Sequence, residues 1–253
     1  MLFLREDQYI GRSLELYGEF SEQEGELFRQ FVGAGHTVVE VGANIGAHTL
    51  HLAKLVGPAG MVLAFEPQRI IFSLLCANIA LNEQFHVQPI RAAVGTTQGT
   101  IQVPVLDPRV RQNFGGLGLS PGARGDSVPV VRLDDYQLPS LRLLKIDVEG
   151  MEPEVLGGAV RTIEQHRPIL YVENDRDANS ARLIRMITEL RYRLYWHLPY
   201  IFDARNFNGV AENIFGGVVS INMLCVPAEM PASVIGLRPI SDPGDSWRAP
   251  ASG

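Results

Sequence analysis

The 253-residue sequence has little cysteine, no block of basic residues and no long apolar run. Its two cysteines, Cys76 and Cys225, stand far apart in apolar surroundings, which favours free thiols in a reducing compartment and excludes a disulfide framework. With a net charge of −6 and no lysine- or arginine-rich segment, the chain lacks the pattern of a nucleic-acid-binding protein. No apolar run approaches the roughly 20 residues of a membrane span. The charges of residues 5–7 come too early for a secretory signal, so we expect a cytoplasmic protein.

Apolar residues, by contrast, are plentiful. They make up 46% of the chain, which is enough for a layered core, and the length fits one large α/β domain. We expect three parts: an N-terminal segment over residues 1–36, a main domain over residues 37–230, and a tail over residues 231–253. The tail is rich in Pro, Ser, Gly and Asp and is predicted to be disordered.

The most informative stretch covers residues 38–50 and reads VVEVGANIGAHTL. Its first residues predict a buried strand, Gly42 and Gly46 predict a turn, and the apolar period that follows predicts a helix. Glycine allows positive φ and close approach of a ligand, and the helix directs its free N–H groups back at the turn. Open α/β sheets hold nucleotides on such turns, and an ordinary strand–turn–helix corner is the alternative.

Further elements are predicted on either side of this motif. Ser21 and Glu24 have the spacing of a capping box, which predicts a helix that begins at residue 22. A strand over residues 61–65 ends at Glu66, which lies 20 residues after Gly46, where doubly wound folds place an acid on ribose hydroxyls. A third strand near residues 87–94 ends in the small residues Ala92 and Ala93, which would leave room for an adenine ring. Residues 95–99 then predict a hairpin turn before a return strand.

Taken together, several of these elements resemble the FkbM-type S-adenosylmethionine (SAM) methyltransferases of class I. They are the Glu40-x-Gly-x-Asn-x-Gly motif, the Glu66-Pro67 pair, the turn over residues 92–95 and the sequence LKIDVEGME over residues 144–152. The resemblance covers roughly residues 36–175. It implies an α/β fold with a Rossmann-like, doubly wound, seven-stranded sheet that is mostly parallel and has a terminal antiparallel strand. It also implies that residues 1–36 cover the cofactor and that the methyl acceptor is usually a hydroxyl of a sugar or secondary metabolite.

The resemblance and the chemistry of the turn together indicate where SAM should bind. An acid near the glycine turn can help to hold the α-ammonium group, and an acid after the second strand can accept hydrogen bonds from the ribose. The expected cofactor-binding residues are Glu40, Gly42, Ala43, Asn44, Gly46, His48, Thr49, Glu66, Pro67, Ala93 and Asp147.

Methyl transfer to a hydroxyl needs alignment, exclusion of water and removal of a proton. One hypothesis uses Mg²⁺: Asp147, Glu173 and Asn174 follow two predicted strands, and this set resembles the magnesium site of catechol-type O-methyltransferases, although that family has Asp at the position of Glu173. Two carboxylates and an amide oxygen are hard ligands that suit this ion.

The metal-free hypothesis uses other residues. Asp147 or Glu149 would orient the acceptor, and His197 or Lys145 would act as the base. Each base also has a structural alternative. Lys145 and Asp147 share one face of a strand, where they would form an ion pair, and His197 lies beside Trp196, where it would pack in an aromatic cluster.

The acceptor itself is less well indicated. The irregular segment over residues 104–130 predicts either a substrate-facing lid or a mobile loop, and Asn113, Phe114 and Trp196 are candidate contacts. The acceptor would be a small molecule, a glycan or a peptide, and the chain a monomer or homodimer. Two alternatives are an N-methyltransferase for a peptide or protein side chain and a SAM-binding partner protein without activity. Asn44 in the turn disfavours an NAD-dependent dehydrogenase.

Overall fold

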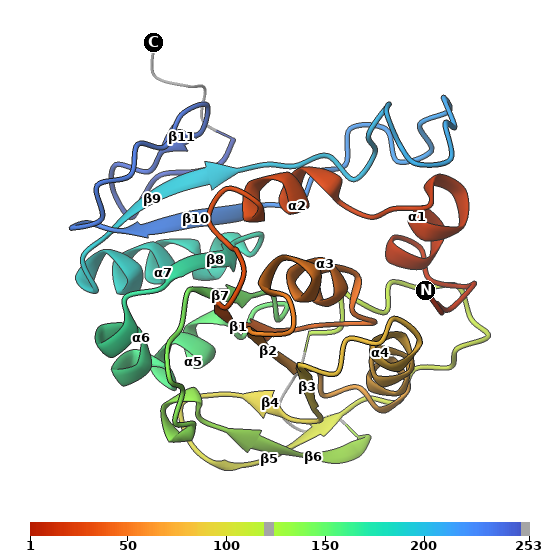
Figure 1. The fold of residues 1–253 in the computed structure, drawn as a ribbon, viewed down its shortest axis with the longest axis horizontal. Helices are drawn as coiled ribbons and strands as arrows, with labels where there is room; N and C mark the ends of the chain where they lie inside the picture. Colours follow the sequence, from red (N-terminus) through yellow and green to blue (C-terminus); the bar gives the residue numbers. More distant parts are fainter. Residues whose placement is uncertain (119–123, 249–253) are drawn as a thin grey trace.

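An eight-stranded sheet forms the centre of the computed structural model, which describes residues 1–118 and 124–248 (Figure 1). The strand order is β11-β9-β10-β8-β7-β1-β2-β3. These strands are β1 (Thr37–Val41), β2 (Met61–Phe65), β3 (Val87–Ile90), β7 (Leu143–Ile146), β8 (Ile169–Glu173), β9 (Tyr192–His197), β10 (Asn222–Pro227) and β11 (Arg238–Pro239).

Most of this sheet is parallel. Strands β3, β2, β1, β7 and β8 run in one direction, and β10 lies antiparallel between β8 and β9. All residues of β1 and β7 are buried, as expected for central parallel strands that are covered on both faces. The prediction of a mostly parallel α/β sheet is confirmed, but the predicted number of seven strands is wrong. The additional strand is β11, which pairs with β9 at the edge of the sheet.

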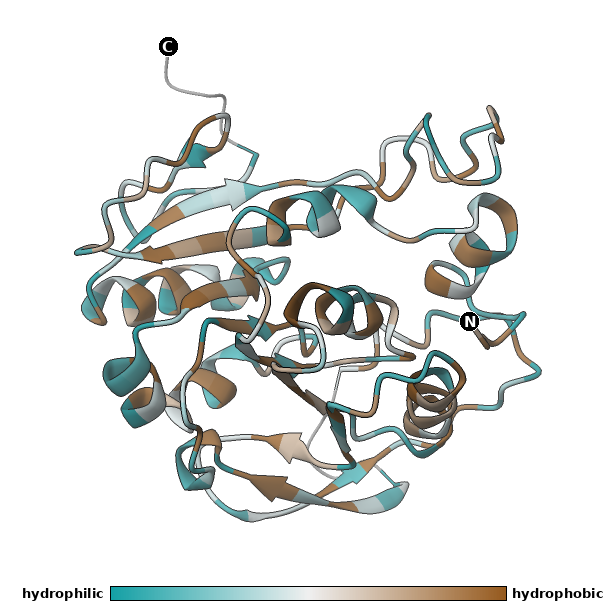
Figure 2. Ribbon diagram, viewed as in Figure 1, coloured by the Kyte–Doolittle hydropathy of each residue, from teal (hydrophilic) through white to brown (hydrophobic). Residues whose placement is uncertain are grey.

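Helices cover both faces of the sheet, and each face has its own apolar core. Phe28, Leu52 and Leu75 belong to one cluster, whereas Val155 and Leu183 belong to the other. In Figure 2, β2 and α4 are mostly brown, which marks them as apolar. Within the described residues, none of the helices has the length and apolar character that crossing a bilayer requires. The helices are α1 (Ile10–Tyr17), α2 (Glu22–Phe28), α3 (Ala47–Val56), α4 (Arg69–Leu81), α5 (Glu152–Gly157), α6 (Val160–His166), α7 (Asp177–Glu189) and the 3-10 helix η1 (Leu133–Asp135).

The structure has a small second sheet where the sequence predicted a hairpin, so the hairpin prediction is wrong. This sheet consists of β4 (Ala93–Val94), β6 (Asp126–Val131) and β5 (Gly99–Val103), in that order. Because β6 lies between the other two strands, β4 and β5 do not pair with each other. The third strand of the main sheet therefore ends at Ile90 instead of continuing to residue 94. Asp126 ties the small sheet to the core, since its carboxylate binds both Arg69 (2.9 Å) and Arg91 (2.8 Å).

The capping box predicted at Ser21 and Glu24 does not form. Helix α2 begins at Glu22 as predicted, but Ser21 has a left-handed backbone with φ of 49° and caps no backbone N–H group. Its hydroxyl instead donates to Oε1 of Glu24 at 2.9 Å. Glu24 is only 3% exposed, because α2 packs against α3 with this side chain facing inward. A surface cap is thus replaced by a buried contact between two side chains.

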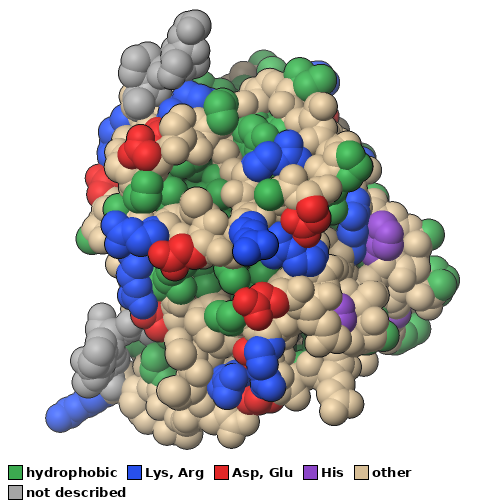
Figure 3. Space-filling view, turned by 90° about the vertical axis from the view of Figure 1, so that its left-hand side faces the viewer, with side chains coloured by type: hydrophobic (Ala, Val, Ile, Leu, Met, Phe, Trp, Pro, Cys, Tyr) green, Lys and Arg blue, Asp and Glu red, His purple; other side chains and the backbone are tan. Residues whose placement is uncertain are grey.

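Residues 231–248, which were predicted to belong to a disordered tail, form defined contacts with the main sheet. The Ile240 N–H group donates to the Leu194 carbonyl, and Arg238 forms an ion pair with Asp245 at 2.8 Å. Residues 249–253 lie outside the described part. Figure 3 shows the left side of Figure 1, where acidic, basic and apolar side chains are interspersed.

One fold prediction concerns Gly42, which follows β1 with φ of +87°. A Cβ at this position would overlap with the carbonyl oxygen of Asp147, because β1 and β7 are adjacent and their ends approach closely. We expect Gly42→Ala to lower the free energy of unfolding by about 2 kcal/mol or more, as both strain and overlap oppose it. Urea denaturation monitored by circular dichroism measures this loss. Gly33→Ala is the control, since a Cβ there meets no atom within 4 Å; equal losses in both variants would contradict the prediction.

Candidate functional site

A cavity of about 490 Å³ lies at the carboxyl ends of the parallel strands. Its walls come from the turn after β1, the ends of β2, β7 and β8, the N-terminal segment and the segment that precedes β10. Open α/β sheets bind their ligands at this edge, because the connections that follow the strands surround it.

The turn after β1 is built around Asn44, which adopts the left-handed conformation with φ of 51°. Asparagine tolerates this conformation better than most residues, so it can stand where a nicotinamide-type motif has glycine. The Asn44 side-chain oxygen accepts a hydrogen bond from the Ile45 N–H group at 2.7 Å. The backbone N–H group of Asn44 donates to Glu66 at 3.1 Å. Gly42, Ala43 and Asn44 line the cavity, whereas Gly46 closes the turn against Leu75.

Glu66 follows β2 and lies in the cavity wall beside this turn. One carboxylate oxygen accepts from the Asn44 N–H group and the other from the Gln68 N–H group at 2.8 Å. Burial raises the pKa of Glu66 to about 7, and these two hydrogen bonds oppose the rise only partly. Each oxygen retains a second acceptor position. Glu66 can therefore accept hydrogen bonds from a ligand that carries hydroxyl groups.

An apolar recess adjoins the main cavity beside Glu66. Pro67, Ala92 and Ala93 contribute to its walls, together with the ends of β1 and β7. The two alanines are almost completely buried and leave space where larger side chains would fill the recess. The arrangement is suited to a flat apolar ring, as the small residues of the third strand predicted.

Glu40, on β1, is buried below the turn and is 1% exposed. It accepts a hydrogen bond from Thr49 Oγ1 at 2.6 Å, and Lys145 Nζ lies 3.6 Å from its other oxygen. Thr49 is fully buried and does not line the cavity, so it acts on Glu40 and not on a ligand. His48 does line the cavity, and its Nε2 lies 3.2 Å from Glu24.

Lys145 is fixed as an ammonium ion, which corrects its assignment as a base. Its side chain is 2% exposed and lies 3.0 Å from Asp147 in addition to its contact with Glu40. Burial alone would lower the pKa of Lys145, but the nearby Asp147, Glu40 and Glu24 raise it above the ordinary value. A group in that state does not accept a proton near neutral pH, and the ion-pair alternative is correct.

Three carboxylates gather at the ends of β7 and β8. Oxygen atoms of Asp147, Glu149 and Glu173 lie within 4.8 Å of one another. Burial and the neighbouring acids raise the pKa of Glu149 to about 7, against the effect of Arg176, and raise that of Glu173 well above its usual range. Arg176 binds Glu149 and also lies 3.3 Å from Asp175. Such a group of acids tends to hold a proton or to bind a cation.

His197 and Trp196 lie away from the cavity. His197 Nδ1 is 2.8 Å from the Tyr171 hydroxyl, and the ring borders a separate cavity between α2 and residues 230–237. Burial lowers the pKa of His197. Trp196 is 3% exposed and donates from Nε1 to Asp245 at 3.4 Å. Because consecutive strand residues face opposite sides of a sheet, each of the two enters a packed layer and neither reaches the cavity. The prediction of His197 as base and Trp196 as substrate contact is wrong.

Two loop predictions need similar correction. Asn174 is buried and donates its amide to Ser180 Oγ at 3.0 Å and to Met223 Sδ at 3.3 Å, so Glu149 replaces it in the acidic cluster. Phe114 is 2% exposed and packs with Ile45 in an apolar cluster that anchors its loop. Asn113, in contrast, lines the cavity as predicted.

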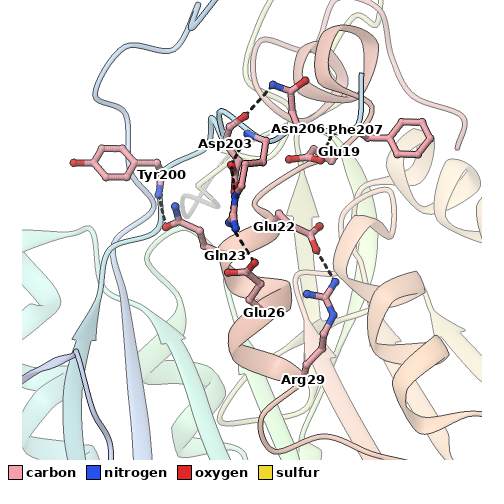
Figure 4. A network of polar contacts seen from close by, with 10 residues as sticks. Glu19, Glu22, Gln23, Glu26, Arg29, Tyr200, Asp203, Asn206 and Phe207 are labelled. Carbon is pink, nitrogen blue, oxygen red and sulfur yellow. Dashed lines mark hydrogen bonds and ion pairs between the residues drawn. The ribbon is translucent and has the colours of Figure 1, made fainter. Parts of the chain in front are cut away.

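The cavity has a cap made of the N-terminal segment, which the sequence predicted to cover the cofactor, and of residues 200–221, which it did not indicate. Contacts in this cap join parts of the chain that are separated by 177 to 197 residues in the sequence. Figure 4 shows two of them, between Glu19 and Phe207 and between Gln23 and Tyr200. The Phe207 N–H group donates to Glu19 at 2.8 Å and the Tyr200 N–H group to Gln23 at 3.3 Å. Tyr17 donates its hydroxyl hydrogen to the Glu212 carbonyl at 2.8 Å, within an apolar cluster that includes Ile201 and Phe215. Glu24 and Arg176 were also missed, because no local pattern shows that they face the cavity.

Comparisons with known proteins agree with this architecture. A family model described as the methyltransferase FkbM domain matches residues 40–194. Methyltransferase 1 of Beauveria bassiana is 29% identical over 143 residues, which is 48% of this chain and 57% of that protein. Methyltransferase sdnD of Sordaria araneosa is 29% identical over 160 residues, covering 48% of this chain and 59% of its own length. The chain thus spans less than two thirds of these curated relatives.

A solved structure shows the same fold. The crystal structure of methyltransferase FkbM from Methylobacillus flagellatus aligns with a TM-score of 0.53 at 17% identity, over 80% of this chain and 50% of that one. At this level of identity the likeness concerns the fold alone. The matched family model covers more than half of the chain and includes the glycine turn, Glu66 and the acidic strand ends. The chain therefore belongs to the FkbM methyltransferase family.

Proposed function

We propose that the protein transfers a methyl group from SAM to a hydroxyl group of a sugar or secondary metabolite. The observation that carries the proposal is the convergence of three groups in one cavity: the Asn44 turn, Glu66, and the acidic ends of β7 and β8. SAM supplies an electrophilic methyl group on a sulfonium centre. The protein has to bind it, align the acceptor and exclude water.

The residues of the cavity fit this cofactor. The recess beside Ala92 and Ala93 suits an adenine ring, and the remaining acceptor positions of Glu66 suit the ribose hydroxyls. The carboxylates of Glu40 and Asp147 lie where the cavity meets the glycine turn, and they suit an α-ammonium group. Lys145 holds both carboxylates in place, so the binding groups are preorganised.

The acceptor hydroxyl must lose a proton, and Glu149 is suited to take it. A general base works best when its pKa lies near the working pH, and the surroundings raise the pKa of Glu149 to about 7. Arg176 orients this carboxylate, and Asp147 is available to orient the acceptor. Since a base for a hydroxyl is present, O-methylation is favoured over the N-methylation of a peptide or protein side chain.

A metal-assisted version would use Asp147, Glu149 and Glu173, which offer hard oxygen ligands for Mg²⁺. Lys145 and Arg176 already compensate two of these acids, which favours the metal-free version. The experiment that tests the function follows radiolabelled methyl groups from SAM into fractionated cell extract, with and without EDTA. We expect label in a small-molecule or glycan fraction that persists with EDTA. Loss of label with EDTA would support the metal-assisted version, and label in protein alone would support N-methylation.

The role of Glu149 predicts a pH dependence. At saturating SAM and acceptor, kcat should rise between pH 6 and pH 8 with an apparent pKa of about 7, because the carboxylate must be ionised to accept a proton. Glu149→Gln should lower kcat by roughly 10²- to 10⁴-fold and remove this rise. Glu154→Gln, which changes an exposed acid on α5, is the control and should leave the profile unchanged. An unaltered profile in Glu149→Gln would show that another group takes the proton.

Glu66 gives a separate prediction for the cofactor. Glu66→Gln keeps the shape of the side chain but replaces one acceptor oxygen with an NH₂ group. We expect SAM binding to weaken by about tenfold, the effect of one hydrogen bond to a charged group. Isothermal titration calorimetry of the variant and of Glu83→Gln, an exposed change after α4, measures this difference. Unchanged affinity in Glu66→Gln would remove Glu66 from the binding site.

A further inference from the structure

A cluster of buried charged side chains borders the cavity. Two of them, Glu24 and His48, have no role in the reaction as proposed above. Glu24 on α2 and His48 on α3 line the cavity together with Glu40, Lys145 and Asp147. Glu24 is 3% exposed and His48 is 9% exposed. Burying a carboxylate costs free energy unless it is compensated, so its position in the cavity wall calls for an explanation.

The contacts of Glu24 show that it is ionised. Its oxygens bind His48 Nε2 at 3.2 Å and accept from the Ser21 hydroxyl at 2.9 Å. Burial would raise the pKa of Glu24, but the charge and hydrogen bond of His48, together with Lys145 and Ser21, lower it to about 2. The rings of Phe20 and Phe28, each with its centroid 5.8 Å from that of His48, hold the imidazole in place. Glu24 is therefore held in its ionised form by the groups that surround it.

The group as a whole contains more acid than base. Three carboxylates, Glu24, Glu40 and Asp147, face two basic groups, Lys145 and His48. Even with both bases protonated, the ionised forms of these three carboxylates outnumber the two cations.

The other charged residues that line the cavity do not restore the balance, since Arg176 adds one cation whereas Glu66, Glu149, Glu173 and Asp175 add four acids. Burial and nearby positive charge lower the pKa of His51, on α3, to about 4, so it stays neutral. Burial raises the pKa of Tyr171, on β8, well above its ordinary value, so it is neutral too. Burial raises the pKa of Glu40, and Lys145, His48 and Thr49 oppose that rise only partly. An excess of negative charge at low dielectric favours a ligand with net positive charge.

The charge of the cofactor changes in the reaction. SAM carries a sulfonium, an ammonium and a carboxylate group and is a net cation, whereas its product S-adenosylhomocysteine (SAH) has lost the sulfonium charge and is neutral overall. We propose that Glu24 is a specificity-determining residue that makes the cavity bind SAM in preference to SAH. This inference rests on the proposed function. The inference explains why α2 brings a charged side chain to the cavity. A preference for SAM would also favour the replacement of bound SAH by SAM after each reaction.

Glu24→Gln tests the inference, because it removes the charge and keeps the shape. The affinities of the full chain for SAM and for SAH are measured by isothermal titration calorimetry. One charge acting at cavity distances should weaken SAM binding by roughly five- to twenty-fold. SAH binding should change about twofold or less, so the ratio of the two dissociation constants falls. Glu24→Asp should retain most of the preference, because it keeps the charge.

Two matched controls separate charge from structure. Glu26→Gln changes an acid on the same helix that is 50% exposed and pairs with Arg205. Ser21→Ala removes the hydrogen bond to Glu24 without changing its charge. Both variants should keep the wild-type ratio. If Glu24→Gln does not fold, as judged by circular dichroism, His48→Gln is measured instead. It should change the preference for SAM over SAH in the opposite direction. Loss of the imidazole leaves Glu24 without its partner, and the preference for SAM should increase.

The outcomes are distinguishable. If the wild-type protein binds neither SAM nor SAH, the proposed function itself fails. If it binds both, and Glu24→Gln weakens both equally or neither, Glu24 is a structural residue and only this inference is overturned. A selective loss of SAM affinity in Glu24→Gln supports it, as does a selective gain in His48→Gln.

Discussion

The buried ammonium group of Lys145 is the interaction on which the site depends. A cation that is removed from water needs partners, and this one has Glu40 on β1 and Asp147 after β7. The same contact joins the two central strands at their carboxyl ends, where the Asp147 carbonyl oxygen leaves no space for a side chain at residue 42. The position of the glycine turn, and with it the floor of the cavity, follows from this arrangement.

Around this floor, the parallel sheet brings together residues that are far apart in the sequence. Glu66 and Glu149 follow β2 and β7, and Glu173 is the last residue of β8. All three line one cavity because parallel strands present their carboxyl ends at one edge. The cap adds both the N-terminal segment and residues 200–221, which Tyr17 joins through its hydroxyl group. Two distant parts of the chain therefore form the cap of the same cavity.

Acidic side chains are the most frequent charged groups in the wall of this cavity. Burial and mutual repulsion raise the pKa values of Glu66, Glu149 and Glu173, whereas the charge and hydrogen bond of His48 help to lower that of Glu24 against the effect of its burial. Glutamate side chains in this cavity thus differ in their charge state, because their surroundings raise the pKa of some and lower the pKa of Glu24. Such differences arise from desolvation and from distance to lysine, arginine or histidine, which tertiary packing sets.

The sequence by itself determined the strand–turn–helix motif, the position of Glu66 and the acidic end of β7, because short-range periodicity and turn chemistry specify these elements. It also predicted the mostly parallel sheet. Only the tertiary structure decided the rest. Strand β6 separated β4 from β5, the layers of the sheet enclosed His197 and Trp196, and packing of α2 turned Ser21 and Glu24 inward. A local pattern shows which residues alternate along an element, but the face that is buried, and what it contacts, depends on partners elsewhere in the chain.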